Sequence, residues 1–287
     1  MSAGKVLKEM LKREGVVMAP GAYDAWSAKL IEQAGFPCVY MTGYGVSASV
    51  LGKPDIGLLT FTEMVAQARN IVAAVNIPVV ADGDNGYGGP LNVVRTTQAY
   101  EQAGLAAIQL EDQVTPKRCG HMEGKEVIPK NEMVAKIKAA IYARKDPDFM
   151  IIARTDARAV NGFDDAMGRA KAYAAAGADI IFFEAPQSVE EMKKIAAEID
   201  VPLMANMVEK GKTPLLTDKE LAAIGFKFAI YPVTAIYCAT KAIMDMLKGL
   251  KASGTTASLL DQIVDFPTFN KMIALEENRD LEKSFTE

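Results

Sequence analysis

Short apolar runs recur along the chain and predict the strands of a parallel sheet. Each run is continuous rather than alternating, and Gly, Pro or charged residues bound it. A strand buried on both faces has this pattern, because helices cover both sides of a parallel sheet. The runs are residues 16–19, 38–41, 77–81, 106–110, 149–153, 180–183, 202–205 and 228–231.

Segments with helical periodicity separate these runs. They include residues 62–74, 91–103, 130–144, 163–176 and 189–199, and several close on a glycine, as helix C-termini commonly do. Strands alternating with helices in this way predict a (β/α)8 barrel rather than an open sheet. We expect residues 1–287 to form one barrel domain, with residues 258–287 as an external helical tail.

Composition agrees with a globular α/β protein. Half of the 287 residues are apolar, about a quarter are charged, and the net charge is -4, which disfavours disorder and nucleic-acid binding. Three cysteines form no disulfide framework, so a reducing cytoplasm is expected. The sequence contains no run of about 18 apolar residues, so no membrane span is expected. The start of the chain lacks the apolar core of a signal peptide.

Polar residues follow most of the apolar runs. Barrel enzymes place their chemistry at the carboxyl ends of the strands, so these residues are expected to share one rim. No Gly-rich phosphate loop follows the first run, which disfavours a nucleotide site. The rim candidates are Thr42, Gly43, Tyr44, Asp82, Asp84, Glu111, Arg154, Glu184 and Asn206.

The acids among these candidates predict a metal site. Asp82, Asp84 and Glu111 follow the third and fourth runs, and like charges repel unless something neutralises them. Mg²⁺ prefers oxygen ligands, keeps several waters and leaves room for substrate oxygens. We therefore expect Mg²⁺ here, against the alternative that these are solvated loop acids.

The segment of residues 117–121 carries a second candidate function. It holds Cys119, Gly120 and His121, the only histidine of the chain, beside two basic residues. Nearby cations make a thiol a usable proton donor or nucleophile. The alternative is a solvated basic loop without chemistry.

Several motifs together resemble the isocitrate lyase and phosphoenolpyruvate mutase superfamily. They are residues 82–88, 111–113, 117–121 and 153–157, and they occur in the same order. The resemblance implies a magnesium-dependent (β/α)8 barrel whose last helix is swapped between subunits, usually in a homotetramer. It also implies that Asp82 binds Mg²⁺ directly and that Asp84 and Glu111 bind it partly through water, with Mn²⁺ as a possible substitute.

The same resemblance assigns roles around a small dicarboxylate substrate. Thr42, Gly43 and Tyr44 are expected to hold the carboxylate of a 2-oxo acid, and Arg154 the oxygen that becomes its ketone. Glu184 and Asn206 are expected to hold the other product, and Gly120 and His121 of the loop are expected to bind the substrate.

The Cys-Gly-His loop is similar to that of the carbon–carbon lyase branch rather than the phosphonate mutases. In that branch the loop closes over the substrate, and its cysteine, here Cys119, protonates the leaving carbanion. The general base stays open between Tyr40 and Asp55. For Tyr40 the alternative is a core tyrosine of a strand.

The substrate is expected to be a dicarboxylate with apolar substituents. Methylisocitrate lyases place arginines where this chain has Tyr237 and Phe269, and an unpaired third carboxylate is costly to bury. Residues 42–47 and 51–55 resemble the dimethylmalate lyase and petal death protein group. We expect the protein to cleave a 2-alkylmalate. The preferred candidate is 2,3-dimethylmalate, which would give propionate and pyruvate. The alternatives are methylisocitrate cleavage to succinate and pyruvate, oxaloacetate hydrolysis, phosphonate mutase chemistry and a non-catalytic dicarboxylate sensor.

Overall fold

The computed structural model describes residues 1–120 and 122–286, which fall into two compact units, Met1–Ile236 and Tyr237–Glu287. The first unit contains the barrel and the residues predicted to form the site, except Tyr237 and Phe269. The prediction that residues 1–287 form one domain stays a prediction, and the second unit begins well before the predicted tail at residue 258.

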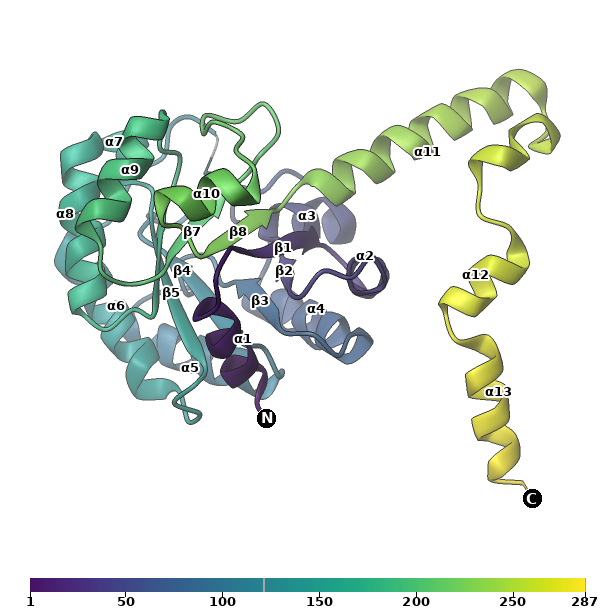
Figure 1. Ribbon diagram of the computed structural model, residues 1–287, viewed down its shortest axis with the longest axis horizontal. Coiled ribbons are helices and arrows are strands. Elements are labelled where there is room, and N and C mark those ends of the chain that lie inside the picture. The colour runs from purple at the N-terminus through teal and green to yellow at the C-terminus, as the bar shows by residue number, and fades with distance from the viewer. Residues whose placement is uncertain (121, 287) are drawn as a thin grey trace. The chain divides into compact units, whose positions relative to one another are not determined.

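Within the described residues, eight parallel strands close into a barrel, which confirms the predicted (β/α)8 architecture (Figure 1). Neighbours in the chain pair in order, and β8 returns to β1 with Val17 opposite Phe228. The strands are β1 (Val17–Ala22), β2 (Val39–Met41), β3 (Val79–Asp82), β4 (Ala107–Glu111), β5 (Met150–Thr155), β6 (Ile180–Phe183), β7 (Leu203–Asn206) and β8 (Phe228–Tyr231).

Each strand divides its side chains between two apolar cores. On β5, Met150 and Ile152 belong to the core inside the barrel, whereas Ile151 and Ala153 belong to the core between strands and helices. Successive side chains of a strand point to opposite faces, so both faces must be apolar. This is why the strands appear in the sequence as continuous apolar runs.

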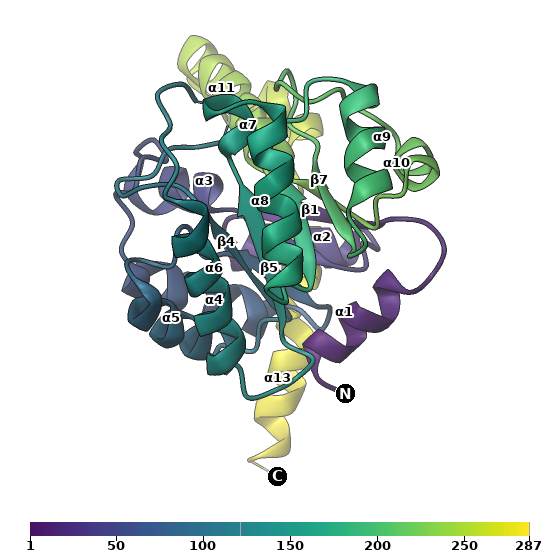
Figure 2. The same ribbon diagram turned by 90° about the vertical axis from the view of Figure 1, so that its left-hand side faces the viewer.

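The helices of the first unit cover the outside of the barrel. α8 packs against β5 and β6, and α5 packs against α6 (Figure 2). The helical segments are α1 (Ala3–Leu11), α2 (Ala25–Gln33), α3 (Gly43–Val46), η1 (Ser47–Leu51), α4 (Phe61–Ala74), α5 (Pro90–Gln102), α6 (Lys130–Ala143), α7 (Ala157–Val160), α8 (Phe163–Ala175), α9 (Val189–Glu198) and α10 (Asp218–Ile224).

Side-chain caps fix where several of these helices begin. Thr60 and Glu63 form a reciprocal capping box at α4, and Thr217 and Glu220 form another at α10. Such caps satisfy the first backbone N–H groups, which have no partner inside the helix. The helices therefore start at defined residues, and this fixes the lengths of the loops that precede them.

The N-terminal helix closes the end of the barrel opposite to the predicted rim. Leu7 and Leu11 of α1 pack into the interior core with Val17 and Met150. Gly4 allows the close approach, since a Cβ atom there would lie 2.2 Å from the carbonyl oxygen of Asp148. Apolar side chains of α1 thus fill the barrel from this end.

The second unit is helical, as predicted for the tail beyond residue 258. It contains most of α11 (Thr234–Ser253), then η2 (Ala257–Gln262), α12 (Phe266–Met272) and α13 (Leu275–Ser284). None of the described residues in these helices is buried, and large apolar side chains such as Leu247 and Phe266 are exposed. Among the described residues, no helix is long and apolar enough to cross a membrane.

Candidate active site

Strand geometry explains why the predicted residues meet at one rim. Arg154 lies two residues beyond Ile152, whose side chain belongs to the core inside the barrel. The same spacing relates Asp82 to Val80 and Asn206 to Met204. Because side chains two residues apart share a face, the polar side chains point into the barrel just beyond its apolar filling.

A cluster of buried charges occupies this rim, and we call it the rim cluster. Counted over the described residues, it joins six carboxylates to three cations. Its members are Asp55, Asp82, Asp84, Glu111, Asp156, Glu184, Lys117, Lys125 and Arg154, and all are buried. Since buried charges need partners, the excess of acid is the main electrostatic feature of the site.

Asp82 and Asp84 form the acidic edge beside β3. The backbone N–H of Asp84 donates to Asp82 Oδ1 at 3.0 Å, and Gln109 Nε2 donates to the same oxygen at 3.3 Å. Asp84 has a φ of 48°, a conformation uncommon for non-glycine residues and often found at functional sites. Burial, together with the charge of Asp84, raises the pKa of Asp82 to about 6.

Lys117 is the cation next to this edge. Its ammonium lies 2.6 Å from Asp55 Oδ1 and 2.6 Å from Asp84 Oδ1. Burial alone lowers the pKa of this lysine, but Asp84 and Asp55 outweigh burial and raise it well above its usual value. Burial raises the pKa of Asp55 despite the nearby lysine. The structure thus assigns Lys117 a counter-ion role that the sequence did not indicate.

Glu111 lacks full compensation. Its Oε2 lies 3.4 Å from Arg154 Nη1, but its buried Oε1 has no hydrogen-bond partner among the described residues. Burial raises the pKa of Glu111 well above its usual value, although Arg154 opposes the shift. A buried oxygen of this kind calls for an additional cation or water.

The three predicted metal ligands share the rim but do not converge on one point. Among the described residues, no group of three or more Cys, Asp and Glu side chains is close enough together to hold a metal ion. Asp84 instead contacts Lys117, and Glu111 contacts Arg154. The assignment of Asp82, Asp84 and Glu111 to a metal site therefore stays a prediction.

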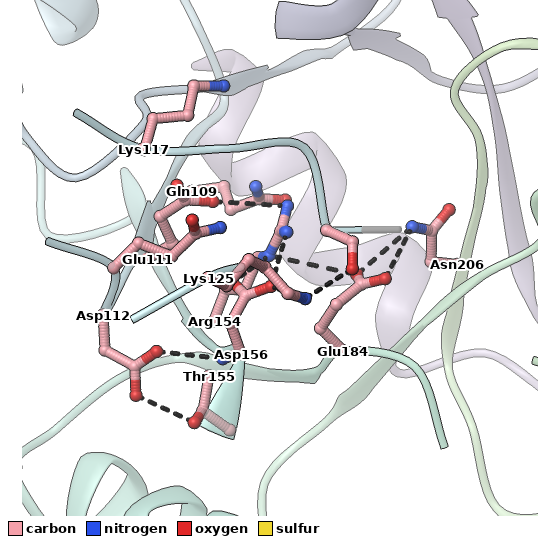
Figure 3. A network of polar contacts seen from close by, with 12 residues as sticks. Gln109, Glu111, Asp112, Lys117, Lys125, Arg154, Thr155, Asp156, Glu184 and Asn206 are labelled. Atoms are coloured by element: carbon pink, nitrogen blue, oxygen red, sulfur yellow. Dashed lines mark hydrogen bonds and ion pairs between the residues drawn. The ribbon is translucent and has the colours of Figure 1, made fainter. Parts of the chain in front are cut away.

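Arg154 lies at the centre of the rim cluster (Figure 3). Its Nε and Nη2 donate to the two carboxylate oxygens of Asp156 at 2.9 and 3.0 Å, and Glu184 Oε2 lies 3.9 Å from Nε. Burial disfavours the guanidinium charge, but Asp156 and Glu111 raise the pKa of Arg154 well above its usual value. A bidentate pair of this kind holds the guanidinium plane in one orientation.

A second carboxylate supports this arrangement from outside the barrel. Asp112 accepts hydrogen bonds from Thr155 Oγ1 at 2.8 Å, from the backbone N–H of Asp156 at 2.9 Å and from Tyr173 of α8 at 2.8 Å. Arg169 of α8 lies 3.3 Å from the same carboxylate. Asp112 therefore ties the end of β5, and with it Asp156, to the covering helix.

Glu184 and Asn206 form the far side of the rim from Lys117. Asn206 Nδ2 donates to the Glu184 carboxylate at 3.2 and 3.4 Å. Figure 3 shows Glu184 between Arg154 and Asn206. The structure thus brings together the two residues predicted to contact the second product.

The residues after β2 lie beside the acidic edge. Gly43 faces Asp82, because a Cβ atom at this position would lie 2.8 Å from Asp82 Oδ2. The Thr42 hydroxyl accepts from the backbone N–H of Gly45 and so begins α3. Tyr44 and Asp55 line a common cavity. Gly43 therefore lies next to Asp82, and the role of Thr42, Gly43 and Tyr44 in holding a carboxylate stays a prediction.

The loop with Cys119 contacts the rim cluster at several points. The N–H of Cys119 donates to the carbonyl of Asp55 at 3.2 Å, and the Lys125 ammonium donates to the carbonyl of Gly120. Gln113 holds the start of the loop through both backbone groups of Arg118, at 2.8 and 2.9 Å. Cys119 itself is partly buried, and His121 lies outside the described residues.

The two candidate bases differ in their surroundings. Tyr40 is buried, its hydroxyl donates to Gln109 Oε1 at 3.0 Å, and burial followed by Asp82 raises its pKa well above the usual value. Forming a phenolate there is costly. Asp55 is a carboxylate next to a lysine and borders the cavity shared with Tyr44. Both roles stay predictions, and the surroundings favour Asp55.

Sequence reasoning missed four residues of the site: Lys117 as a counter-ion, Lys125, Asp156 as a ligand of Arg154, and Gln109. The sequence could have indicated Gln109, because it is the one polar residue inside the apolar run 106–110. It could not have indicated Lys125, because a lysine in a loop is ordinarily solvated. Tyr237 belongs to the second unit, and its predicted place in the substrate pocket stays a prediction.

A closed parallel barrel with buried charges at the carboxyl ends of its strands defines a barrel enzyme. The family model of phosphoenolpyruvate phosphomutase matches residues 7–251. The chain is 54% identical over 285 residues to the 2,3-dimethylmalate lyase of Eubacterium barkeri, covering 99% of each protein. It is 43% identical over 283 residues to a 2-methylisocitrate lyase of Aeropyrum pernix, covering 98% of this chain and 91% of that protein.

Solved structures agree with these relatives. A crystal structure of a 2,3-dimethylmalate lyase matches with a TM-score of 0.94 at 36% identity, over 99% of this chain and 95% of that one. Phosphonopyruvate hydrolase, solved with oxalate and Mg²⁺, matches with a TM-score of 0.90 at 30% identity, over 100% of both chains. The chain belongs to the phosphoenolpyruvate mutase/isocitrate lyase superfamily, and the prediction of a carbon–carbon lyase is confirmed.

The close approach of Gly120 generates a testable prediction. A Cβ atom at residue 120 would lie 2.4 Å from Arg154 Nη2 and 2.9 Å from Glu184 Cδ. We expect Gly120→Ala to displace the loop and to lower turnover about 10- to 100-fold, because a misplacement of about 1 Å costs about that much. Steady-state kinetics and the urea unfolding midpoint measure the effect.

Gly168→Ala is the matched control. Gly168 lies inside α8 with open space around its Cα, so alanine is expected to keep activity and to add about 0.5–1 kcal/mol to the free energy of unfolding. Normal turnover by Gly120→Ala would show that the loop does not take this position in the working enzyme.

Proposed function

We propose that the protein is a Mg²⁺-dependent lyase that cleaves the C2–C3 bond of a 2-alkylmalate, with 2,3-dimethylmalate giving propionate and pyruvate. The observation that carries the proposal is the excess of acid in the rim cluster beside a cysteine-bearing loop. Six buried carboxylates face three cations among the described residues. The identity of 54% to a 2,3-dimethylmalate lyase supports the choice of substrate.

The donor set fits a hard divalent cation. Asp82, Asp84 and Glu111 offer only oxygen ligands, and the orphaned Oε1 of Glu111 and the raised pKa of Asp82 are consistent with a missing positive charge. Asp82 would hold Mg²⁺ directly, and Asp84 and Glu111 would hold it partly through water. When bound, Mg²⁺ would polarise the substrate oxygens and stabilise negative charge on them. Mn²⁺ accepts the same ligands.

The chain's own residues bind and orient the substrate. Thr42, Gly43 and Tyr44 would hold the carboxylate of the part that becomes pyruvate, next to Asp82. The Arg154 guanidinium, fixed by Asp156, would donate to the hydroxyl oxygen that becomes the ketone. Glu184 and Asn206 would contact the part that becomes propionate.

Two proton transfers complete the reaction. A base removes the proton of the tertiary hydroxyl, the C2–C3 bond breaks, and its electron pair moves to C3 to give an enediolate. Asp55 is the better candidate for the base, because it borders a cavity, whereas the Tyr40 hydroxyl donates to Gln109 and burial raises its pKa well above the usual value. The Cys119 thiol then gives its proton to C3, and closure of the loop excludes water from this intermediate.

We further propose a cytoplasmic homotetramer in which the C-terminal helices are exchanged between subunits. The second unit supports this, because its described apolar side chains are exposed within one chain. Large exposed apolar patches mark interaction sites. The exposed apolar side chains of this unit include Ile243, Met244, Leu247, Leu260, Val264, Phe266 and Leu281.

The metal requirement is tested by removing the ion and then its ligand. We expect EDTA to abolish turnover, Mg²⁺ to restore it, and Asp82→Ala to lose both turnover and Mg²⁺ binding measured by calorimetry. Asp164→Ala, which removes an exposed carboxylate from the first turn of α8, is expected to keep both. Full activity of metal-free enzyme would refute the metal site.

The role of the thiol is tested with Cys119→Ser. The serine hydroxyl has a similar shape but is a far weaker acid, so the chemical step is expected to fall about 10²- to 10⁴-fold with substrate binding retained. Single-turnover kinetics measure the step. Cys38→Ala removes a thiol from the core inside the barrel and is expected to keep the rate. Near-normal turnover by Cys119→Ser would leave the loop as a cover without chemistry.

The choice of substrate is tested by competition between dicarboxylate and tricarboxylate. If Tyr237 and Phe269 line the pocket, burial of a methyl group gains about 0.8 kcal/mol, whereas a third carboxylate without a partner loses more. We expect kcat/KM for 2,3-dimethylmalate to exceed that for methylisocitrate by about 10²-fold or more.

Tyr237→Arg is expected to narrow this difference by supplying a bidentate partner. Tyr142→Arg, at an exposed tyrosine of α6, is the control that adds the same charge elsewhere. Equal or faster cleavage of methylisocitrate by the unmodified protein would identify it as a methylisocitrate lyase instead.

A further inference from the structure

Lys125 is a buried lysine that none of the proposed steps uses. Its ammonium lies 2.8 Å from Asp156 Oδ1 and donates to the carbonyl of Gly120 (Figure 3). The side chain is 2% exposed. A buried ammonium is costly unless partners compensate it, so both contacts are needed for this lysine to stay in place.

The two partners of Lys125 belong to two different functional parts. Gly120 is the residue after Cys119 in the loop, and its main chain packs against Arg154 and Glu184. Asp156 follows β5 and binds Arg154 through both carboxylate oxygens. Lys125 therefore connects the loop that carries the thiol with the carboxylate that orients the guanidinium.

The contact between Lys125 and Gly120 lies in the part of the loop that follows Cys119. Gln113 already fixes Arg118 at the start of the loop, and Lys117 is bound by Asp55 and Asp84. Beyond Cys119, Lys125 is a described side chain of the rim cluster that donates to the loop backbone, at the carbonyl of Gly120. Asp156 itself is fixed from behind by Asp112, so the loop is tied to a rigid point.

We propose that Lys125 is a positioning residue that holds the Cys119 loop closed over Arg154 through Asp156. This proposal rests on the proposed function, in which the closed loop covers the substrate. The ion pair fixes the ammonium, and the ammonium fixes the carbonyl of Gly120. Loop closure and the orientation of Arg154 thereby share one carboxylate.

The test compares loop opening in Lys125→Met with that in a matched variant. Arg144→Met is the match, because Arg144 also contacts one carboxylate, Asp179 at 2.6 Å, and one carbonyl, Phe149 at 2.9 Å. Those contacts precede β5 and β6, at the opposite end of the barrel. Trypsin cleavage after Arg118, followed by mass spectrometry, reports opening without any need for turnover.

We expect Lys125→Met to speed cleavage after Arg118 by about tenfold or more, as loss of a buried charge-assisted contact implies. Arg144→Met is expected to leave the cleavage rate unchanged while lowering the unfolding midpoint. The Lys125→Met enzyme is also expected to lose about tenfold in kcat with a much smaller change in KM, because its loop is open more of the time.

Lys125→Arg and Lys125→Gln supply the second comparison and keep the test valid if Lys125→Met does not fold. Arginine retains the charge for Asp156, whereas glutamine retains only a donor for Gly120. The proposal requires slower cleavage after Arg118 in the arginine variant than in the glutamine variant. Equal rates in the two variants, or wild-type cleavage and kcat in Lys125→Met, would overturn it.

The proteolysis result separates this proposal from the proposed function. If the unmodified protein cleaves none of the 2-alkylmalates but Lys125→Met still opens the loop, the positioning role stands and the substrate assignment fails. If the unmodified protein cleaves 2,3-dimethylmalate and Lys125→Met matches it in both readouts, the substrate assignment stands and the positioning role fails.

Discussion

The rest of the site depends on the need to compensate the buried carboxylates at the barrel rim. Six of these acids face three cations among the described residues, and burial raises the pKa of Asp82, Asp55 and Glu111. An ion taken out of water without a partner costs several kcal/mol, so each acid either contacts a cation or retains its proton. The arrangement of Lys117, Arg154 and Lys125 follows from this requirement, and the remaining excess of acid is what a divalent cation would neutralise.

The barrel and the membership of its rim could be predicted from the sequence, because both follow from local rules. A strand buried on two faces must be apolar throughout, so the strands appear as runs and their ends as the first polar residues. Asp82, Arg154 and Asn206 were found in this way, and the two-residue spacing from Val80, Ile152 and Met204 explains why they point inward. Secondary structure alone therefore places these side chains.

The contacts between rim residues could not be predicted, because they join segments that are far apart in the sequence. Asp112 lies beside Glu111 in the chain, yet it points out of the barrel and binds Tyr173 and Arg169 of α8. Because side chains alternate along a strand, the residue after the inward-pointing Glu111 is expected to point outward. The sequence does not indicate which residues Asp112 contacts there. From the sequence, Lys125 is likewise expected to be a solvated loop lysine. The structure shows that its ammonium contacts Asp156.

The loop with Cys119 brings its own counter-ions to the rim. Lys117 at its start compensates Asp55 and Asp84, and Lys125 at its end compensates Asp156. The thiol lies between these two ties, so the contacts that neutralise the acids also place Cys119 over the barrel. In this structure, the contacts that neutralise the acids are therefore also contacts that hold the loop against the barrel. A loop of the same length without the two lysines would leave Asp55, Asp84 and Asp156 with fewer cationic partners, at a cost of several kcal/mol for each uncompensated buried charge.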